Sequence, residues 1–178
     1  FIDTGLPPEK ARSLIRIGDT VAFAGNYRKL TPDLRSAKAL DNRASVACGI
    51  MILKDLVDAP RSISISFVAT SQEEYTGLGA RVFSNRLPLD YALVIDVSHA
   101  EYPDLREGEF YPLNSGPTIG RGGTIPHKLY QTLVETAREL EIPYQVEPMP
   151  STTGTDADDI AFNKDGIPTA ILGIPLRY

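Results

Sequence analysis

The feature that most constrains the fold is a continuous apolar run, Tyr91-Ala92-Leu93-Val94-Ile95, which closes on Asp96 and Val97. An unbroken apolar run of this length is typical of a strand buried on both faces, as in a parallel sheet covered by helices. Segments with helical periodicity alternate with such apolar runs along the chain. This alternation predicts an α/β fold, with a mixed and mostly parallel sheet flanked by helices.

The other elements are predicted from periodicity. Apolar residues recur at helical spacing from Ala44 to Val57, whereas Ser62 to Ala69 alternates polar and apolar residues as a strand does. We further predict helices over 79–87, 126–140 and 156–163, and strands over 91–97, 117–120, 144–149 and 168–174. Residues 101–112, rich in Glu, Pro and Asp, are predicted to form a loop.

The first 35 residues differ from the rest. They are rich in turn formers, with a predicted short helix from Pro7 to Ile15 and a predicted strand over 20–23. They do not contain a full domain's core, so we predict a small β-rich appendage over 1–35 and the main domain over 36–178. Because the chain opens on Phe1 and stops at Tyr178 straight after a predicted strand, we expect sequence to be missing on both sides.

Composition excludes several classes of protein. The 178 residues are 42% hydrophobic and 23% charged, as in soluble globular proteins. The formal net charge is −5 and no basic cluster is present, which argues against binding nucleic acid through phosphates. No apolar run approaches the roughly 20 residues of a membrane span. The single cysteine, Cys48, excludes an intrachain disulfide and suggests a reducing, cytoplasmic compartment. Its apolar neighbours indicate a small buried residue rather than a nucleophile.

Acidic residues fall where α/β proteins build sites, beyond the carboxyl ends of strands. Asp96 ends the apolar run and is equally interpretable as a ligand or as an N-terminal cap for the next segment. Glu73 and Glu74 come after the strand predicted to end near Thr70. If the backbone bends there, one carboxylate could bind a metal while the other acts as general base. For an isolated Glu-Glu pair, two solvated loop acids are the simpler interpretation.

Two further acids precede predicted helices. Asp41 is compatible with an N-cap or with a metal ligand, and the local pattern does not choose between them. Asp156 lies in a Thr-Gly-Thr-Asp-Ala segment where acids suit the positive end of a helix dipole. The only histidines are His99 and His127, so a dinuclear site built from this chain alone is short of nitrogen ligands.

Taken in order, several short segments resemble one family. They are Leu40-Asp41-Asn42-Arg43, Glu73-Glu74 with 77–80, Asp96-Val97, Gly116-Pro117, 154–157, 166–169 and 174–178. Their order and spacing resemble the glutamyl and deblocking aminopeptidases, dinuclear metallo-aminopeptidases whose members often form tetrahedral dodecamers. Some members have been labelled endoglucanases. The resemblance covers nearly the whole chain.

The resemblance implies a zinc-aminopeptidase-like catalytic domain over 36–178, with 1–35 the end of an inserted, PDZ-like dimerisation domain. It implies two divalent metals, zinc or cobalt with manganese as a third candidate. Asp41 would bridge the metals with a cis peptide bond after it, Glu74 and Asp96 would each bind one, and Glu73 would be the general base. Asp156 would lie at the substrate end of the cleft. The substrates would be peptides, and the protein a homo-oligomer.

The chain also departs from the family pattern. The family takes one metal-binding histidine from upstream of Asp41 and another from just after the Arg-Tyr pair, and neither position is filled here. Two rival functions therefore stay open. One is a noncatalytic fragment or assembly subunit of the same fold. The other is a glycoside hydrolase using paired carboxylates, although the chain has no tryptophan to serve as a sugar platform.

Overall fold

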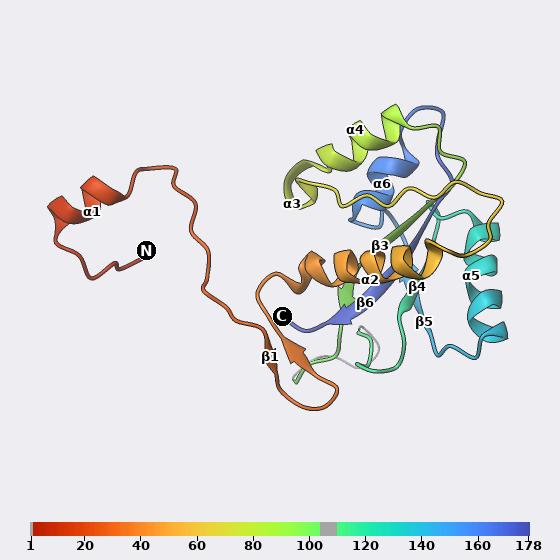
Figure 1. The fold of residues 1–178 in the computed structure, drawn as a ribbon, viewed down its shortest axis with the longest axis horizontal. Helices are drawn as coiled ribbons and strands as arrows, with labels where there is room; N and C mark the ends of the chain where they lie inside the picture. Colours follow the sequence, from red (N-terminus) through yellow and green to blue (C-terminus); the bar gives the residue numbers. More distant parts are fainter. Residues whose placement is uncertain (1, 104–109) are drawn as a thin grey trace. The chain divides into compact units, whose positions relative to one another are not determined.

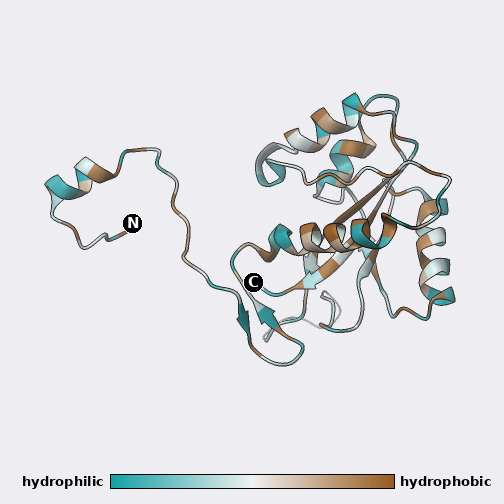
Figure 2. Ribbon diagram, viewed as in Figure 1, coloured by the Kyte–Doolittle hydropathy of each residue, from teal (hydrophilic) through white to brown (hydrophobic). Residues whose placement is uncertain are grey.

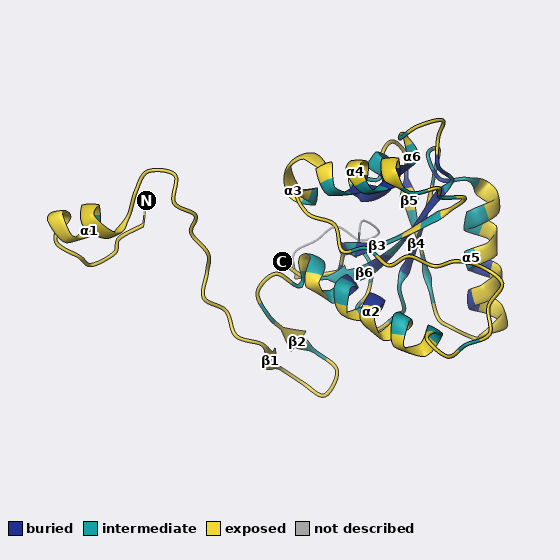
Figure 3. Ribbon diagram, turned by 45° about the horizontal axis from the view of Figure 1, so that its top comes forward, coloured by how far each residue is buried: buried dark blue, intermediate teal, exposed yellow. Residues whose placement is uncertain are grey.

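The computed structural model describes residues 2–103 and 110–178 and divides the chain into two units, Phe1–Lys38 and Ala39–Tyr178 (Figure 1). The first unit holds helix α1 (Pro8–Leu14) and an antiparallel pair of short strands, β1 (Arg28–Lys29) and β2 (Arg35–Ser36). None of residues 2–38 is buried, as the largely yellow ribbon of Figure 3 shows. The assignment of this unit to a PDZ-like domain stays a prediction.

The strand predicted over 20–23 is wrong. These residues are irregular in structure, and the side chains of Val21 and Phe23 are 70% and 92% exposed. A β-strand is stable only when a neighbour satisfies its backbone and covers one face. Neither condition is met here within the described chain, so local β propensity does not produce a strand.

The second unit is built on a four-stranded sheet in the order β3-β6-β4-β5. Its strands are β3 (Ala92–His99), β4 (Thr118–Gly122), β5 (Gln145–Met149) and β6 (Thr169–Leu176). β3 is parallel to β6 and β4 is parallel to β5, whereas β4 runs antiparallel to β6. The predicted mixed, mostly parallel sheet is confirmed. Hydrophobic residues concentrate in β3 and β6 (Figure 2).

Helices cover both faces of the sheet. Neighbouring residues on β6 show this, because Ile171 packs in a cluster with Ala157 of α6 (Asp156–Ala161), whereas Leu172 packs against Val134 of α5 (His127–Glu139). Successive strand residues point to opposite faces, so α5 and α6 lie on opposite sides. α2 (Leu40–Leu56) packs on β3 and β6, and α4 (Leu78–Arg86) packs on α6. The short α3 (Glu73–Thr76) was not predicted.

The strand predicted over Ser62–Ala69 is also wrong. The segment pairs with none of the described strands, and Ile63 and Ile65 are 66% and 43% exposed. Its alternating pattern fits a strand, but a strand exists only with a hydrogen-bonded neighbour. Phe67 makes a close contact all the same, since its ring lies where a Cβ on Gly49 of α2 would be. That contact anchors the segment as it approaches Thr70.

The loop predicted over 101–112 lies partly outside the described residues. Its end is tied back by an isolated bridge between Ala100 and Tyr111. As for membranes, no helix among the described residues is long and apolar enough to cross one.

Candidate functional site

Asp96 lies in the middle of β3, not at its end as the sequence suggested. The strand continues to His99 because β6 keeps pairing as far as Leu176. The Asp96 side chain is 7% exposed, and its Oδ1 accepts hydrogen bonds from Val97 N at 2.8 Å and from Asn42 Nδ2 at 2.6 Å. It caps no helix, so the capping interpretation of Asp96 is excluded.

Asp41 and Asn42 form the entry to α2 and are linked by a cis peptide bond, as the resemblance implied. Both have non-helical dihedral angles, and the helix winds regularly only after them. The capping role considered for Asp41 belongs to Asn42, whose Oδ1 accepts from Ser45 N at 3.3 Å. The Asn42 amide also donates to Ile95 O at 3.3 Å, so Asn42 ties the start of α2 to β3.

Glu73 and Glu74 open the short helix α3, which begins after Gln72 in a left-handed conformation (φ 62°). Consecutive residues on a helix point about 100° apart, so the two carboxylates diverge only partly. Glu73 is partly buried and Glu74 is exposed. The bend that the functional interpretation required is therefore present.

Asp156 reaches the same neighbourhood from the first turn of α6. Its Oδ2 accepts a hydrogen bond from Thr70 Oγ1 at 2.5 Å, which joins the loop before Glu73 to α6. Its Oδ1 is buried and has no hydrogen-bond partner in the described chain. An unpaired buried carboxylate oxygen is costly, so it marks a place where a further donor or cation would stabilise the fold.

The pKa values of these acids reflect electrostatic repulsion between them. Burial raises the pKa of Glu73 to about 7, and the negative charges of Asp96, Asp156, Glu74 and Asp41 contribute to the rise in that order. Burial likewise raises the pKa of Asp96 to about 6, opposed only by the Val97 amide. Burial also raises the pKa of Asp156, against the hydrogen bond from Thr70. The fold thus brings the five predicted carboxylates close enough to interact electrostatically.

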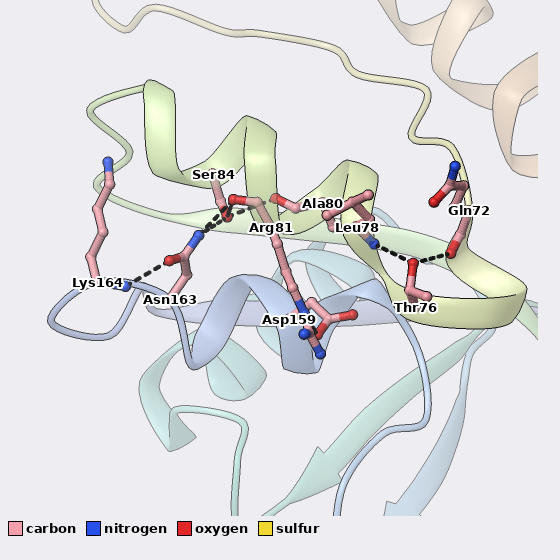
Figure 4. Close-up of polar contacts among 9 residues, drawn as sticks. All are labelled: Gln72, Thr76, Leu78, Ala80, Arg81, Ser84, Asp159, Asn163 and Lys164. Atoms are coloured by element: carbon pink, nitrogen blue, oxygen red, sulfur yellow. Dashed lines mark hydrogen bonds and ion pairs between the residues drawn. The ribbon is translucent and has the colours of Figure 1, made fainter.

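A cavity of about 300 Å³ opens beside Glu73 and Glu74. The other lining residues are Gly154, Thr155 and the first turn of α6. There, Asp158 accepts hydrogen bonds from Thr153 N and Gly154 N at 3.0 and 2.8 Å. Figure 4 shows how α4 is fixed to α6 and to the turn after it: Arg81 Nε lies 2.6 Å from Asp159 Oδ1 of α6, and Asn163 Nδ2, just after α6, donates to Ser84 Oγ. These contacts hold the lining of the cavity in place.

The ligand arrangement is looser than the predicted roles require. No group of three His, Cys, Asp or Glu side chains among the described residues converges tightly enough to enclose a metal ion. Neither histidine joins the acids, since the His99 ring packs on Phe110 and the His127 ring stacks on Tyr130. The structure brings the carboxylates into one neighbourhood and leaves their roles as metal ligands a prediction.

Two residues of this neighbourhood were missed in the sequence. Asn42 orients Asp96, and Thr70 holds Asp156. Thr70 lies at the end of the segment predicted to be a strand, where site residues are expected, so its position was a usable signal. Asn42 carried no signal of its own beyond adjacency to Asp41, because its contact with Asp96 spans 54 positions of sequence.

The raised pKa values lead to a prediction about stability. The folded state binds protons at Asp96 and Glu73 more tightly than the unfolded chain does, so their contribution to stability falls as pH rises from about 4 to about 7. In chelator at pH 8, Asp96→Asn should raise the free energy of unfolding by about 1 kcal/mol, or about 2–4 °C in Tm. The full pKa change would give about 3 kcal/mol, but solvent screens the cluster.

Denaturant unfolding at pH 4, 6 and 8 measures this effect. Asparagine keeps an oxygen that can accept from Asn42 and Val97, so the substitution removes mainly the charge. The gain should vanish near pH 4, where the parent carboxyl is largely protonated in the folded state. Asp90→Asn, at an exposed acid just before β3, is the matched control and should change stability by less than about 0.5 kcal/mol. A stability gain independent of pH would contradict the prediction.

Comparison with known proteins decides the family. The sequence model of the M42 glutamyl aminopeptidases matches residues 1–178, the whole chain. The chain belongs to the M42 glutamyl aminopeptidase family. The family resemblance read from the ordered motifs is thereby confirmed, and with it the α/β fold class.

Similar proteins agree with this membership. The lysyl aminopeptidase of Pyrococcus furiosus is 38% identical over 181 residues, covering 100% of this chain and 51% of its own length. An aminopeptidase from Desulfurococcus kamchatkensis superimposes with a TM-score of 0.87 at 31% identity, over 96% of this chain and 49% of that one. The TET1 peptidase of Pyrococcus horikoshii, which can assemble into a tetrahedron or an octahedral shell, gives 0.76 at 26% identity, with coverage of 96% and 50%. The chain spans about half the length of the curated relatives it matches.

Proposed function

We propose that this chain is the catalytic part of a metal-dependent aminopeptidase, which hydrolyses the N-terminal peptide bond of peptides through an activated water. The observation that carries the proposal is the Glu73 carboxyl, whose pKa is raised to about 7 and which borders an open cavity. A general base is most effective when its pKa lies near the working pH. Membership of the M42 family and the aminopeptidases similar to this chain support the same reaction.

Two divalent metal ions are the proposed cofactors, zinc or cobalt with manganese as a third candidate. Asp41, Glu74 and Asp96 would hold them through carboxylate oxygens, which such ions accept as ligands. The charge of these residues suits a cation, because Asp41 and Glu74 raise the pKa of Asp96, and an added cation would reverse that repulsion. When bound, such ions polarise a carbonyl and lower the pKa of coordinated water toward neutrality.

The chain's own residues would divide the remaining work. Glu73 would take a proton from the attacking water and return it to the leaving amine nitrogen. Asn42 would keep the Asp96 carboxylate oriented, since it donates to Oδ1 together with the Val97 amide. Thr70 and Asp156 would hold the loop that carries Glu73 against α6.

The cavity favours a substrate with a free amino group. Glu73, Glu74, Asp158 and Asp159 line it, and the one cation among its described lining residues, Arg81, is already paired with Asp159. This excess of carboxylates would attract the substrate's N-terminal ammonium group and select exopeptidase action. The same charge would disfavour an acidic N-terminal residue, in keeping with a relative named for lysine.

Assembly and location are further proposals. The similarity to TET peptidases that form dodecamers and larger shells supports a homo-oligomer, with the tetrahedral dodecamer as the proposed form. The single cysteine supports a reducing, cytoplasmic compartment.

Metal removal and an aminopeptidase assay test the function together. We expect the protein to release p-nitroaniline from aminoacyl-p-nitroanilides, to lose that activity on dialysis against a chelator, and to regain it with Zn²⁺, Co²⁺ or Mn²⁺. An N-acetylated substrate is the control and should not be cleaved, because it lacks the free amine.

Other outcomes identify the rivals. Glycoside hydrolysis is tested as an alternative because one similar structure is described as a peptidase or endoglucanase. Cleavage of cello-oligosaccharides that survives chelation would replace the proposal with a glycosidase. Absence of both bound metal and peptidase activity would favour a noncatalytic subunit of the same fold.

A further inference from the structure

A second cavity, of about 430 Å³, shares no lining residue with the cavity beside Glu73 and Glu74. Its lining residues come from the carboxyl ends of β4 and β5 and from the first turn of α5. Asp96 and Thr118 are both paired with Gly173, so they share one face, whereas Arg121 shares the opposite face with Ile119. Gly122 and Ile125 lie on the Asp96 face, so the lining comes from both faces at the end of the sheet. The cavity is separate from the proposed catalytic site because the two cavities share no lining residue. It is lined by Arg121, Gly122, Ile125, His127, Tyr130, Val146 and Pro148.

Arg121 is the charged group of this cavity. Its guanidinium carbon lies 5.4 Å from the centroid of the Tyr130 ring, so the ring holds the cation in place through its face. The described residues give Arg121 no carboxylate partner and no hydrogen bond to its guanidinium. Stacking on a ring leaves the edge of the guanidinium, with its N–H donors, available to a planar anion.

The start of α5 adds a second source of positive potential. Pro126 is the residue before the helix, and no side chain caps the first turn. The free amides of that turn, together with the helix dipole, favour a negative charge nearby. The His127 ring stacks on Tyr130 at 6.2 Å between centroids and 24° between planes, which places an N–H-bearing ring on the cavity wall.

The rest of the lining is apolar. Ile125 is 6% exposed and forms part of a core cluster, while Val146 and Pro148 add exposed aliphatic surface from the edge strand β5. A small hydrophilic anion would bind Arg121 and leave this apolar surface exposed to water. A ligand that carries a carboxylate on an apolar body would satisfy both parts of the cavity, whose volume suits a small molecule.

We propose that this cavity binds the C-terminal residue of a peptide, with the α-carboxylate on Arg121 and the apolar side chain against Ile125, Val146 and Pro148. The acyl group on the nitrogen of such a residue removes the positive charge that Arg121 and the helix end would repel. The site is thus distinct from the proposed catalytic cavity, whose acidic lining would attract the opposite end of a peptide.

Titration of the full chain with N-acetyl-leucine, monitored through the aromatic NMR signals of tyrosine and histidine, tests the site. N-acetyl-leucine should shift the Tyr130 and His127 signals, whereas N-acetyl-leucinamide, which lacks the charge, should bind at least about tenfold more weakly. Arg121→Gln should weaken binding of the acid by a similar factor. Lys128→Gln is the matched control, because Lys128 is exposed beside His127 and lies outside the lining.

Three results would overturn the proposal. They are equal binding of the acid and its amide, unchanged binding in Arg121→Gln, and equal binding of inorganic phosphate, which would indicate a general anion site. The comparison of acid with amide uses the unsubstituted protein, so it decides the question even if Arg121→Gln fails to fold.

Discussion

Replacing Glu73 by Gln should lower kcat of the protein by about 10²–10⁴-fold, the range that a general base contributes. The amide has nearly the same shape as the carboxyl but cannot accept the water's proton. The substitution also removes the residue whose pKa burial and four neighbouring carboxylates raise to about 7. We therefore expect the loss in turnover without loss of fold, and greater stability than the parent at pH 8 in chelator.

Metal content separates the base from a ligand. Elemental analysis of Glu73→Gln should show the parent's metal content, whereas loss of metal would mean that Glu73 is a ligand and not the base. Glu139→Gln, at an exposed acid of α5, is the control and should keep full activity. In the parent, activity should rise with pH as Glu73 loses its proton, with a midpoint below about 7 because bound cations lower the pKa of a carboxyl. Retained turnover in Glu73→Gln would refute the assignment.

Gly79→Ala should damage the site through the backbone. A Cβ on Gly79 would lie 2.5 Å from both the N and the O of Ser71, whose carbonyl accepts the Gly79 amide at 3.1 Å. Backbone atoms cannot rotate away as the end of a side chain can, so the start of α4 must separate from the loop before Glu73. We expect a loss of about 1–3 kcal/mol in stability, typical of overpacking, and at least about tenfold in kcat/KM, since small misplacement of a catalytic group is costly.

Thermal unfolding and steady-state kinetics measure both effects. Gly123→Ala is the matched control, because no atom lies within 4 Å of its added Cβ and its φ is not positive. It should match the parent in Tm and in kcat/KM. A Gly79→Ala protein as stable and active as the parent would show that Ser71 and α4 do not position Glu73.

Both predictions concern a site that lowers the stability of the folded state. Several carboxylates that raise one another's pKa destabilise the fold at neutral pH, as strained functional sites commonly do. Contacts from other elements hold these acids in place, such as those of Asn42 with Asp96 and of Thr70 with Asp156.

Local sequence patterns predicted most elements correctly and failed for a definable reason. The helix at α5 has a clear helical periodicity and the strands at β3 and β6 are clear apolar runs, and their bounds differ from the predicted ones by one or two residues. The strands predicted over 20–23 and 62–69 had equally good patterns. They did not form because strand formation requires a partner, and a partner is not a property of the segment itself.

The sequence by itself determined the fold class, the family and the order of Asp41, Glu73, Glu74, Asp96 and Asp156, because each depends on residue type and spacing along one chain. Only the tertiary structure decided what those acids do to one another. It placed Asp96 inside β3, assigned the cap of α2 to Asn42, and raised the pKa of Glu73. The physical reason is that burial and Coulomb interactions act across space, between residues that adjacency in sequence does not relate.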